Sequence, residues 1–302
     1  MKYLITYSLL LITIALNAQQ NSQYSHYVLN YYSENPAVAG STKCVDFKMG
    51  GRYQWLGMEG APSSIFASIH GPIGNKKKPY RKGRHGIGLY IERDRMHIIT
   101  ETYVKGSYAY HQRLSRGLTG AAGIFVGVKQ YSIDNVTNDP AVGGSALQYP
   151  DLMPGVMLYN NKMYLGLGIE HLYPNRIKAT ASSKFKNQYY FSGGYRFPGA
   201  GNFMIFQSFN FKFNFMGPPS IDLSQAWEHK KITLGASYRV GEAIVLFFRL
   251  RLFKTFNVAY AFDFPLNKLR TGFATSHEVI LGVSKCRTDL GNPEMHACPA
   301  YR

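Results

Sequence analysis

The stretch SFNFKFNFMGPP, residues 208–219, has an aromatic side chain at every second position. The phenylalanines are Phe209, Phe211, Phe213 and Phe215, and they alternate with Ser208, Asn210, Lys212 and Asn214. Successive strand residues point to opposite faces, so the pattern predicts a β-strand with one aromatic and one polar face. A soluble sandwich would turn the aromatic face to its core, whereas a transmembrane barrel would turn it to lipid.

The same alternation recurs along most of the chain, and nothing reads convincingly as a helix. Typical lengths of the candidate strands lie near the roughly 9 to 11 residues that a tilted membrane strand needs, whereas sandwich strands average about 5 or 6. The sequence therefore predicts an all-β protein, a transmembrane antiparallel β-barrel of about 14 strands. The candidate strands are 46–56, 63–71, 85–93, 101–113, 117–131, 152–160, 163–172, 187–198, 202–216, 219–227, 230–240, 242–251, 254–265 and 275–285.

The N-terminus, MKYLITYSLLLITIALNAQQ, has the pattern of a secretory signal peptide with cleavage after Ala18. No later apolar run approaches the roughly 18 residues of a membrane helix, so membrane insertion would have to be as a barrel. We therefore divide the chain into a signal peptide (1–18), an N-terminal periplasmic or plug segment (19–45), an outer-membrane barrel (46–285) and a C-terminal periplasmic tail (286–302).

One predicted inner connection breaks the rule that periplasmic turns are short. It reads GPIGNKKKPYRKGRHG and is strongly basic. It is either a solvated loop or a docking element for an anionic periplasmic surface, such as peptidoglycan or an acidic complex subunit. Its cations are Lys76, Lys77, Lys78, Arg81, Lys82 and Arg84.

The formal net charge of +17 would ordinarily suggest nucleic acid as a partner. Export by a signal peptide argues against nucleic acid and favours lipid headgroups, cell-wall polymers or an acidic protein. The compartment also permits disulfides, and Cys286 and Cys298 bracket a short polar tail. We predict that these two pair, with free thiols or pairing through Cys44 as alternatives.

No enzyme signature is found. Ser276, His277 and Glu278 are consecutive, but on a strand His277 points away from the other two, so they do not form a triad. No cysteine pair has close zinc-ligand spacing. We expect no catalytic, cofactor-binding or metal-binding residue.

Several stretches, in order, resemble the PorP/SprF family, outer-membrane proteins of the type IX secretion system of Bacteroidota. They are QYSHYVLNYYSENPAVAG (23–40), RYQWLGMEGAPSS (52–64), SIHGPI (68–73), GIGLYIERD (86–94), LGASYR (234–239), YAFDF (260–264) and SHEVIL (276–281). The resemblance implies a barrel that works with the secretion and gliding machinery. It also implies partners, namely the C-terminal domain of a secreted adhesin or other cargo, periplasmic type IX subunits or a peptidoglycan-binding protein, and outer-membrane lipid.

Charged residues on the polar strand faces are expected to point into the barrel and pair there, because lipid penalises charge. They are either structural ion pairs that fill the lumen or a recognition surface for cargo, with Trp55 and the Gly-Ala-Pro turn at its rim. The candidate contacts are Arg52, Trp55, Gly60, Ala61, Pro62, Asp222, Arg239, Asp263 and Glu278. We expect a protein that secretes or anchors cargo by binding it; the alternative is a small-solute or anion channel.

Overall fold

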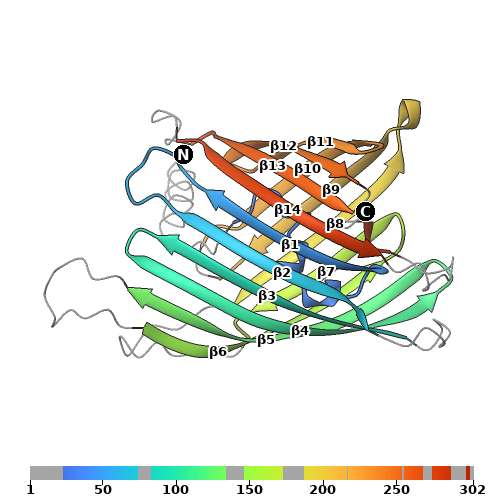
Figure 1. Ribbon diagram of the computed structural model, residues 1–302, viewed down its shortest axis with the longest axis horizontal. Coiled ribbons are helices and arrows are strands. Elements are labelled where there is room, and N and C mark those ends of the chain that lie inside the picture. The colour runs from blue at the N-terminus through green and yellow to red at the C-terminus, as the bar shows by residue number, and fades with distance from the viewer. Residues whose placement is uncertain are drawn as a thin grey trace, which may run out of the picture.

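The computed structural model describes residues 23–73, 83–133, 146–172, 187–215, 217–253, 255–267, 274–286 and 297–299. Fourteen strands form a closed barrel in which each strand pairs antiparallel with its sequence neighbours and β1 pairs with β14 (Figure 1). The predicted fold class and strand number are confirmed. The strands are β1 (Cys44–Tyr53), β2 (Ser63–Ile73), β3 (Arg84–Met96), β4 (Ile99–Ser115), β5 (Leu118–Ile133), β6 (Ala146–Tyr159), β7 (Met163–Glu170), β8 (Gln188–Pro198), β9 (Met204–Phe213), β10 (Ser220–His229), β11 (Ile232–Arg239), β12 (Ala243–Leu252), β13 (Phe256–Pro265) and β14 (Ser276–Cys286).

The predicted strand bounds need one clear correction. β6 begins at Ala146, six residues before the predicted start at 152, and it contains Pro150, which cannot donate a ladder hydrogen bond. Pairing with β5 carries the strand through this position, where Val128 lies opposite Pro150. The next residue, Asp151, points inward, and its carboxylate accepts the Tyr103 hydroxyl.

The two faces of the barrel differ as the alternating pattern predicts. Outward side chains at mid-strand are apolar and exposed, for example Val126 at 57% and Leu246 at 56%. In β9 the Phe209, Phe211 and Phe213 side chains face out, while Ser208, Asn210 and Lys212 are buried inside. An exposed apolar outer surface on a closed sheet fits lipid rather than water.

The connections distinguish the two ends of the barrel. At one end most connections are long, among them 134–145 and 171–187, although the β3–β4 turn (97–98) is short. At the other end the connections have two to five residues, apart from 74–83. We call the first the outer end and the second the periplasmic end, because outer-membrane barrels place short turns in the periplasm. In the described residues, no helix is long and apolar enough to cross a membrane.

Residues 23–43 lie inside the barrel, and nearly all of their side chains are buried. The segment contains two short 3₁₀ turns, η1 (Tyr31–Ser33) and η2 (Pro36–Val38). Lumen-facing glycines allow its backbone to approach the wall. A Cβ at Gly86 would lie 1.9 Å from the Ala39 carbonyl oxygen, and one at Gly123 would lie 2.7 Å from Ala37 N. A third short turn, η5 (Ala200–Asn202), connects β8 to β9.

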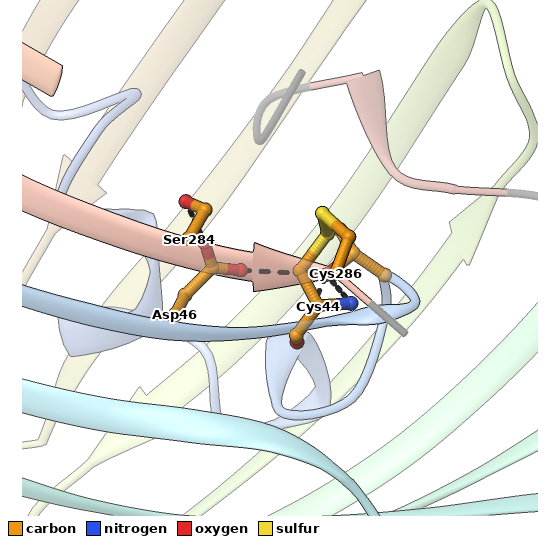
Figure 2. Close-up of a disulfide and its surroundings, with 5 residues drawn as sticks. Cys44, Asp46, Ser284 and Cys286 are labelled. Carbon is orange, nitrogen blue, oxygen red and sulfur yellow. Dashed lines mark hydrogen bonds between the residues drawn. A yellow bond between two sulfur atoms is a disulfide. The ribbon is translucent and has the colours of Figure 1, made fainter. Parts of the chain in front are cut away.

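The disulfide of the structure links Cys44 to Cys286 across the seam between β1 and β14 (Figure 2). The predicted Cys286–Cys298 pair is therefore wrong. Closure of the barrel places the first residue of β1 opposite the last residue of β14, although 242 positions separate them in sequence. Cys298 is instead buried and lies outside this disulfide, and its backbone N–H donates to the Ser41 carbonyl.

Candidate functional site

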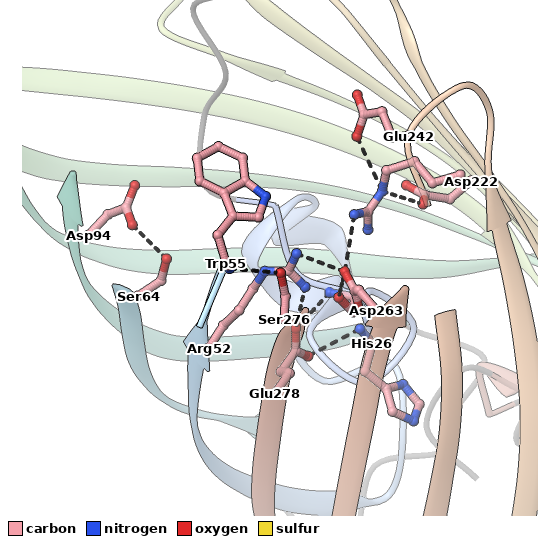
Figure 3. A network of polar contacts seen from close by, with 12 residues as sticks. His26, Arg52, Trp55, Ser64, Asp94, Asp222, Glu242, Asp263, Ser276 and Glu278 are labelled. Carbon is pink, nitrogen blue, oxygen red and sulfur yellow. Dashed lines mark hydrogen bonds and ion pairs between the residues drawn. The ribbon is translucent and has the colours of Figure 1, made fainter. Parts of the chain in front are cut away.

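A cluster of charged side chains lies inside the outer end of the barrel (Figure 3). Arg52 of β1 donates to Asp263 of β13 at 2.8 Å, and its other guanidinium nitrogen is 3.6 Å from Glu278 of β14. These side chains meet because strand register places Arg52 directly opposite Glu278, and both point inward. All three are buried, so water does not screen them.

Arg239 extends the cluster from β11. Its guanidinium donates to Asp222 of β10 at 2.9 Å and to Asp263 at 3.4 Å, and it lies 3.8 Å from Glu242. Asp222 and Arg239 are opposite each other in the register of β10 and β11. Asp263 therefore lies between two arginines and joins both halves of the cluster.

The same carboxylates hold the internal segment in place. Glu278 accepts the backbone N–H of Ser25 at 2.6 Å and that of His26 at 3.1 Å, while the Ser25 hydroxyl donates to Asp263 at 2.7 Å. The His26 ring packs against Phe247, with ring centroids 4.6 Å apart. Burial, with smaller contributions from Arg249 and Lys48, lowers the pKa of His26 to about 3, so this imidazole is neutral at physiological pH.

A cavity of about 320 Å³ opens above the cluster, at the outer mouth. Arg52, Arg239 and Asp263 form part of its floor, and Gln23, Trp55 and Ser276 are among its other lining residues. Trp55 has a left-handed backbone (φ 49°), and its backbone N–H donates to the Ser276 hydroxyl at 3.2 Å. Within the described residues, Arg52 Nε and Nη1, Arg239 Nη2 and Asp263 Oδ1 have no hydrogen-bond partner, and all four atoms are buried.

Residues 16–283 match the protein family described as "Type IX secretion system membrane protein PorP/SprF". The chain belongs to this family. It is therefore an outer-membrane protein of the type IX secretion system, as its closed barrel and apolar outer surface also indicate. The predicted family and location are confirmed.

No curated protein sequence matches this PorP/SprF protein. Among solved structures, the Ralstonia pickettii toluene transporter TbuX is 10% identical, with a TM-score of 0.52 over 84% of this chain and 92% of that one. A deletion mutant of the monoaromatic hydrocarbon channel TodX is 9% identical, with a TM-score of 0.50 over 91% of this chain and 98% of that one. At such low identity, these matches show a shared barrel fold.

The predicted contacts of the PorP/SprF barrel are brought together only in part. Arg52, Asp222, Arg239, Asp263 and Glu278 form one network. Gly60, Ala61 and Pro62 lie in the connection between β1 and β2, and none of them lines the cavity. Gly60 has a φ of 70°, and a Cβ there would lie 2.3 Å from His97 Nδ1, so this glycine shapes the loop.

The predicted basic docking loop lies mostly outside the described residues, which include none of Lys76, Lys77, Lys78, Arg81 and Lys82. Arg84, the last of its predicted cations, is described, and its assignment to an exposed loop is wrong. It is the first residue of β3, it is buried, and it donates to the Tyr159 hydroxyl at 2.5 Å. Its strand position turns it into the lumen, where it bonds to a tyrosine of β6, three strands away.

A second polar network lies in the lumen, and it was not predicted from the sequence. Lys212 of β9 is 2.6 Å from Glu34 of the internal segment, and Asn210 donates to the same carboxylate at 2.9 Å. Lys105 of β4 donates to the Ser33 carbonyl at 2.9 Å. The strand alternation indicated that these side chains face inward, but their partners come from a segment without periodicity.

Asp151, Glu170 and His171 have potential ligand atoms within 4.8 Å of one another. The contacts of the carboxylates favour an ion-pair network over a metal site. Asp151 accepts the Tyr103 hydroxyl, and Glu170 accepts the Tyr190 hydroxyl at 2.6 Å and lies 4.0 Å from the Lys105 ammonium. A buried ammonium this close would repel a divalent cation.

Proposed function

We propose that this type IX outer-membrane protein binds a secreted adhesin or other cargo at its outer mouth and holds it at the cell surface without catalysis. The observation that carries the proposal is the combination of a filled lumen with an open cavity at the outer end. A barrel whose interior is occupied is suited to presenting a fixed binding surface. The family also supports a role in secretion rather than in metabolism.

The proposed contact surface is the outer cavity with Trp55 at its edge. Tryptophan and arginine dominate the energetics of protein interfaces, since each provides a large contact area and directional donors. Arg52, Arg239 and Asp263 line the cavity and give it charged groups of both signs for a polypeptide to contact. Ion pairs on both sides fix these groups before cargo arrives, which lowers the entropic cost of binding.

A channel function is less well supported. Residues 23–43 run through the lumen and are bound to its wall by Glu278, Asp263, Lys48 and Lys212. We therefore infer that they act as a permanent plug. Periplasmic type IX subunits or a peptidoglycan-binding protein are the proposed partners at the other end, with the basic loop that includes Lys76 to Lys78 as their docking element.

The proposal is tested by affinity purification of the tagged, crosslinked protein from its own outer membrane, followed by mass spectrometry. The chain has two tryptophans, and these provide a matched pair of variants. Trp55→Ala should reduce the recovery of cargo at least tenfold, since it removes a large aromatic contact from the cavity lining. Trp227→Ala, which removes an exposed tryptophan on the outward face of β10, should leave recovery unchanged.

Recovery of the barrel without any secreted protein, or equal losses in the two variants, would contradict cargo binding at the outer mouth. Conductance in planar bilayers tests the plug separately. The wild-type protein should show no steady open pore, and a steady pore would favour the channel instead.

A further inference from the structure

Charge is distributed unequally along the barrel axis. In the described part of the chain, the acidic residues near the periplasmic strand ends are Asp46 and Glu228. Both form hydrogen bonds or ion pairs with other side chains of the barrel. Asp46 is buried and accepts the Ser284 hydroxyl, and Glu228 pairs with Arg196 at 3.0 Å and Arg249 at 3.3 Å. The described acids at this end therefore leave little negative charge for the outside of the barrel.

Exposed cations, in contrast, surround the periplasmic end. They lie on the β4–β5, β6–β7 and β10–β11 turns and at the end of β14, so they are spread around the circumference. We call this set the periplasmic basic rim, and it consists of Arg116, Lys162, Lys230, Lys231 and Lys285. Because the described acidic residues at this end are engaged inside the barrel, the described part of the rim presents positive charge around the circumference.

Each part of the rim lies next to an exposed apolar side chain. Leu114 (59% exposed) is two residues from Arg116, Met163 follows Lys162, and Ile232 follows Lys231. Lys285 lies opposite the outward-facing Val45 in the pairing of β14 with β1. Phe253, on the neighbouring β12–β13 turn, is 85% exposed. Cations beside exposed apolar groups on a lipid-facing surface mark the boundary between hydrocarbon and headgroups.

We propose that the periplasmic basic rim binds the phosphate groups of anionic phospholipids in the inner leaflet of the outer membrane. A protein that docks beneath the barrel would need cations on one face, whereas lipid surrounds the barrel on every side, as the rim does. The apolar side chains next to these cations would contact the acyl chains of the same lipids. The rim thereby fixes the depth and tilt of the barrel, and so keeps the outer cavity level with the cell surface.

The test is native mass spectrometry of the purified full-length protein in detergent, titrated with phosphatidylglycerol or phosphatidylethanolamine. Wild-type protein should retain phosphatidylglycerol preferentially. The double variant Lys230→Gln with Lys231→Gln should lose about fivefold in phosphatidylglycerol affinity per cation, since one cation near an anionic headgroup contributes about a factor of five. Affinity for the zwitterionic lipid should not change.

The matched control is Arg93→Gln with Arg95→Gln. These arginines are also exposed on the outer wall, but they lie at the outer end of β3. This variant should bind phosphatidylglycerol as the wild type does. The shift between the folded and heat-denatured bands on gel electrophoresis verifies that each variant is folded.

Two results of the lipid titration would overturn the proposal, and a third outcome would replace the lipid by a protein. One is equal retention of both lipids by the wild type. The other is an equal loss in the rim and control variants, which would mean that total charge, rather than the rim, attracts the lipid. An acidic periplasmic protein that co-purifies with the wild type and not with the rim variant, without any lipid preference, would assign the rim to a protein partner instead.

Discussion

The buried pair of Lys212 and Glu34 gives the sharpest test of how the internal segment is held. Its atoms are 2.6 Å apart, the Asn210 amide also donates to the carboxylate at 2.9 Å, and both charged side chains are more than 90% buried. Lys212→Met leaves a buried carboxylate without its cation, which should lower the free energy of unfolding by about 3–5 kcal/mol. Glu34→Leu leaves a buried ammonium and an unsatisfied amide, so its cost should be at least as large.

The double variant, Glu34→Leu with Lys212→Met, removes both charges and leaves the Asn210 amide unsatisfied. It should cost only about 1–3 kcal/mol. The two substitutions are therefore strongly non-additive, with a coupling free energy of about 3 kcal/mol or more. The measurement is urea unfolding of all four proteins in the same liposomes. Additive losses, or single variants within about 1 kcal/mol of the wild type, would refute the view that this pair fixes the segment in the lumen.

Three further predictions follow from the disulfide, the internal histidine and the lipid face. Cys44→Ser should lower the free energy of unfolding by about 2–5 kcal/mol. Thiol titration of the denatured, unreduced wild type should detect one reactive thiol, and peptide mapping should identify it as Cys298 because Cys44 and Cys286 are joined in the disulfide. Because the pKa of His26 is lowered from 6.5 to about 3 in the folded protein, the unfolded state binds one more proton than the folded state between these pH values. The free energy of unfolding should therefore fall as the pH drops through this window. In urea titrations, His26→Phe should make this dependence on pH shallower by about 1.4 kcal/mol per pH unit. Phe209 lies at the middle of β9, so Phe209→Arg should cost about 2–4 kcal/mol of folding free energy in liposomes. Phe215 lies beyond the outer end of the strand, so Phe215→Arg should cost only about 0–1 kcal/mol. Equal costs would contradict the assigned depth of the two residues in the membrane.

The strand pattern was predictable because it depends on a local rule. Side chains alternate between two environments along every strand, so SFNFKFNF by itself indicates which residues face lipid and which face inward. The charges Arg52, Asp222, Arg239, Asp263 and Glu278 were assigned to the lumen by the same rule, and the structure brings them into one network. The predicted strand at 152–160 begins too late, because Pro150 and Asp151 disfavour a strand locally. In the structure, pairing with β5 extends β6 through both residues.

The nature of the interior could not be predicted in the same way. The polar face of β9 is by itself equally consistent with a water-filled lumen, in which a bulky charge at position 210 would be tolerated. Asn210 is instead 0% exposed and bonded to Glu34, so Asn210→Arg would displace the internal segment. Alternation gives the direction of a side chain but not the identity of what it meets.

The sequence by itself determined the strands, their inward and outward faces and the family, because these follow from residues close together in the chain. Only the tertiary structure decided the rest. Closure of the barrel placed Cys44 opposite Cys286, turned Arg84 toward Tyr159, and brought residues 23–43 against strands up to 253 positions away. These contacts depend on register summed around fourteen strands, and no local pattern carries that information.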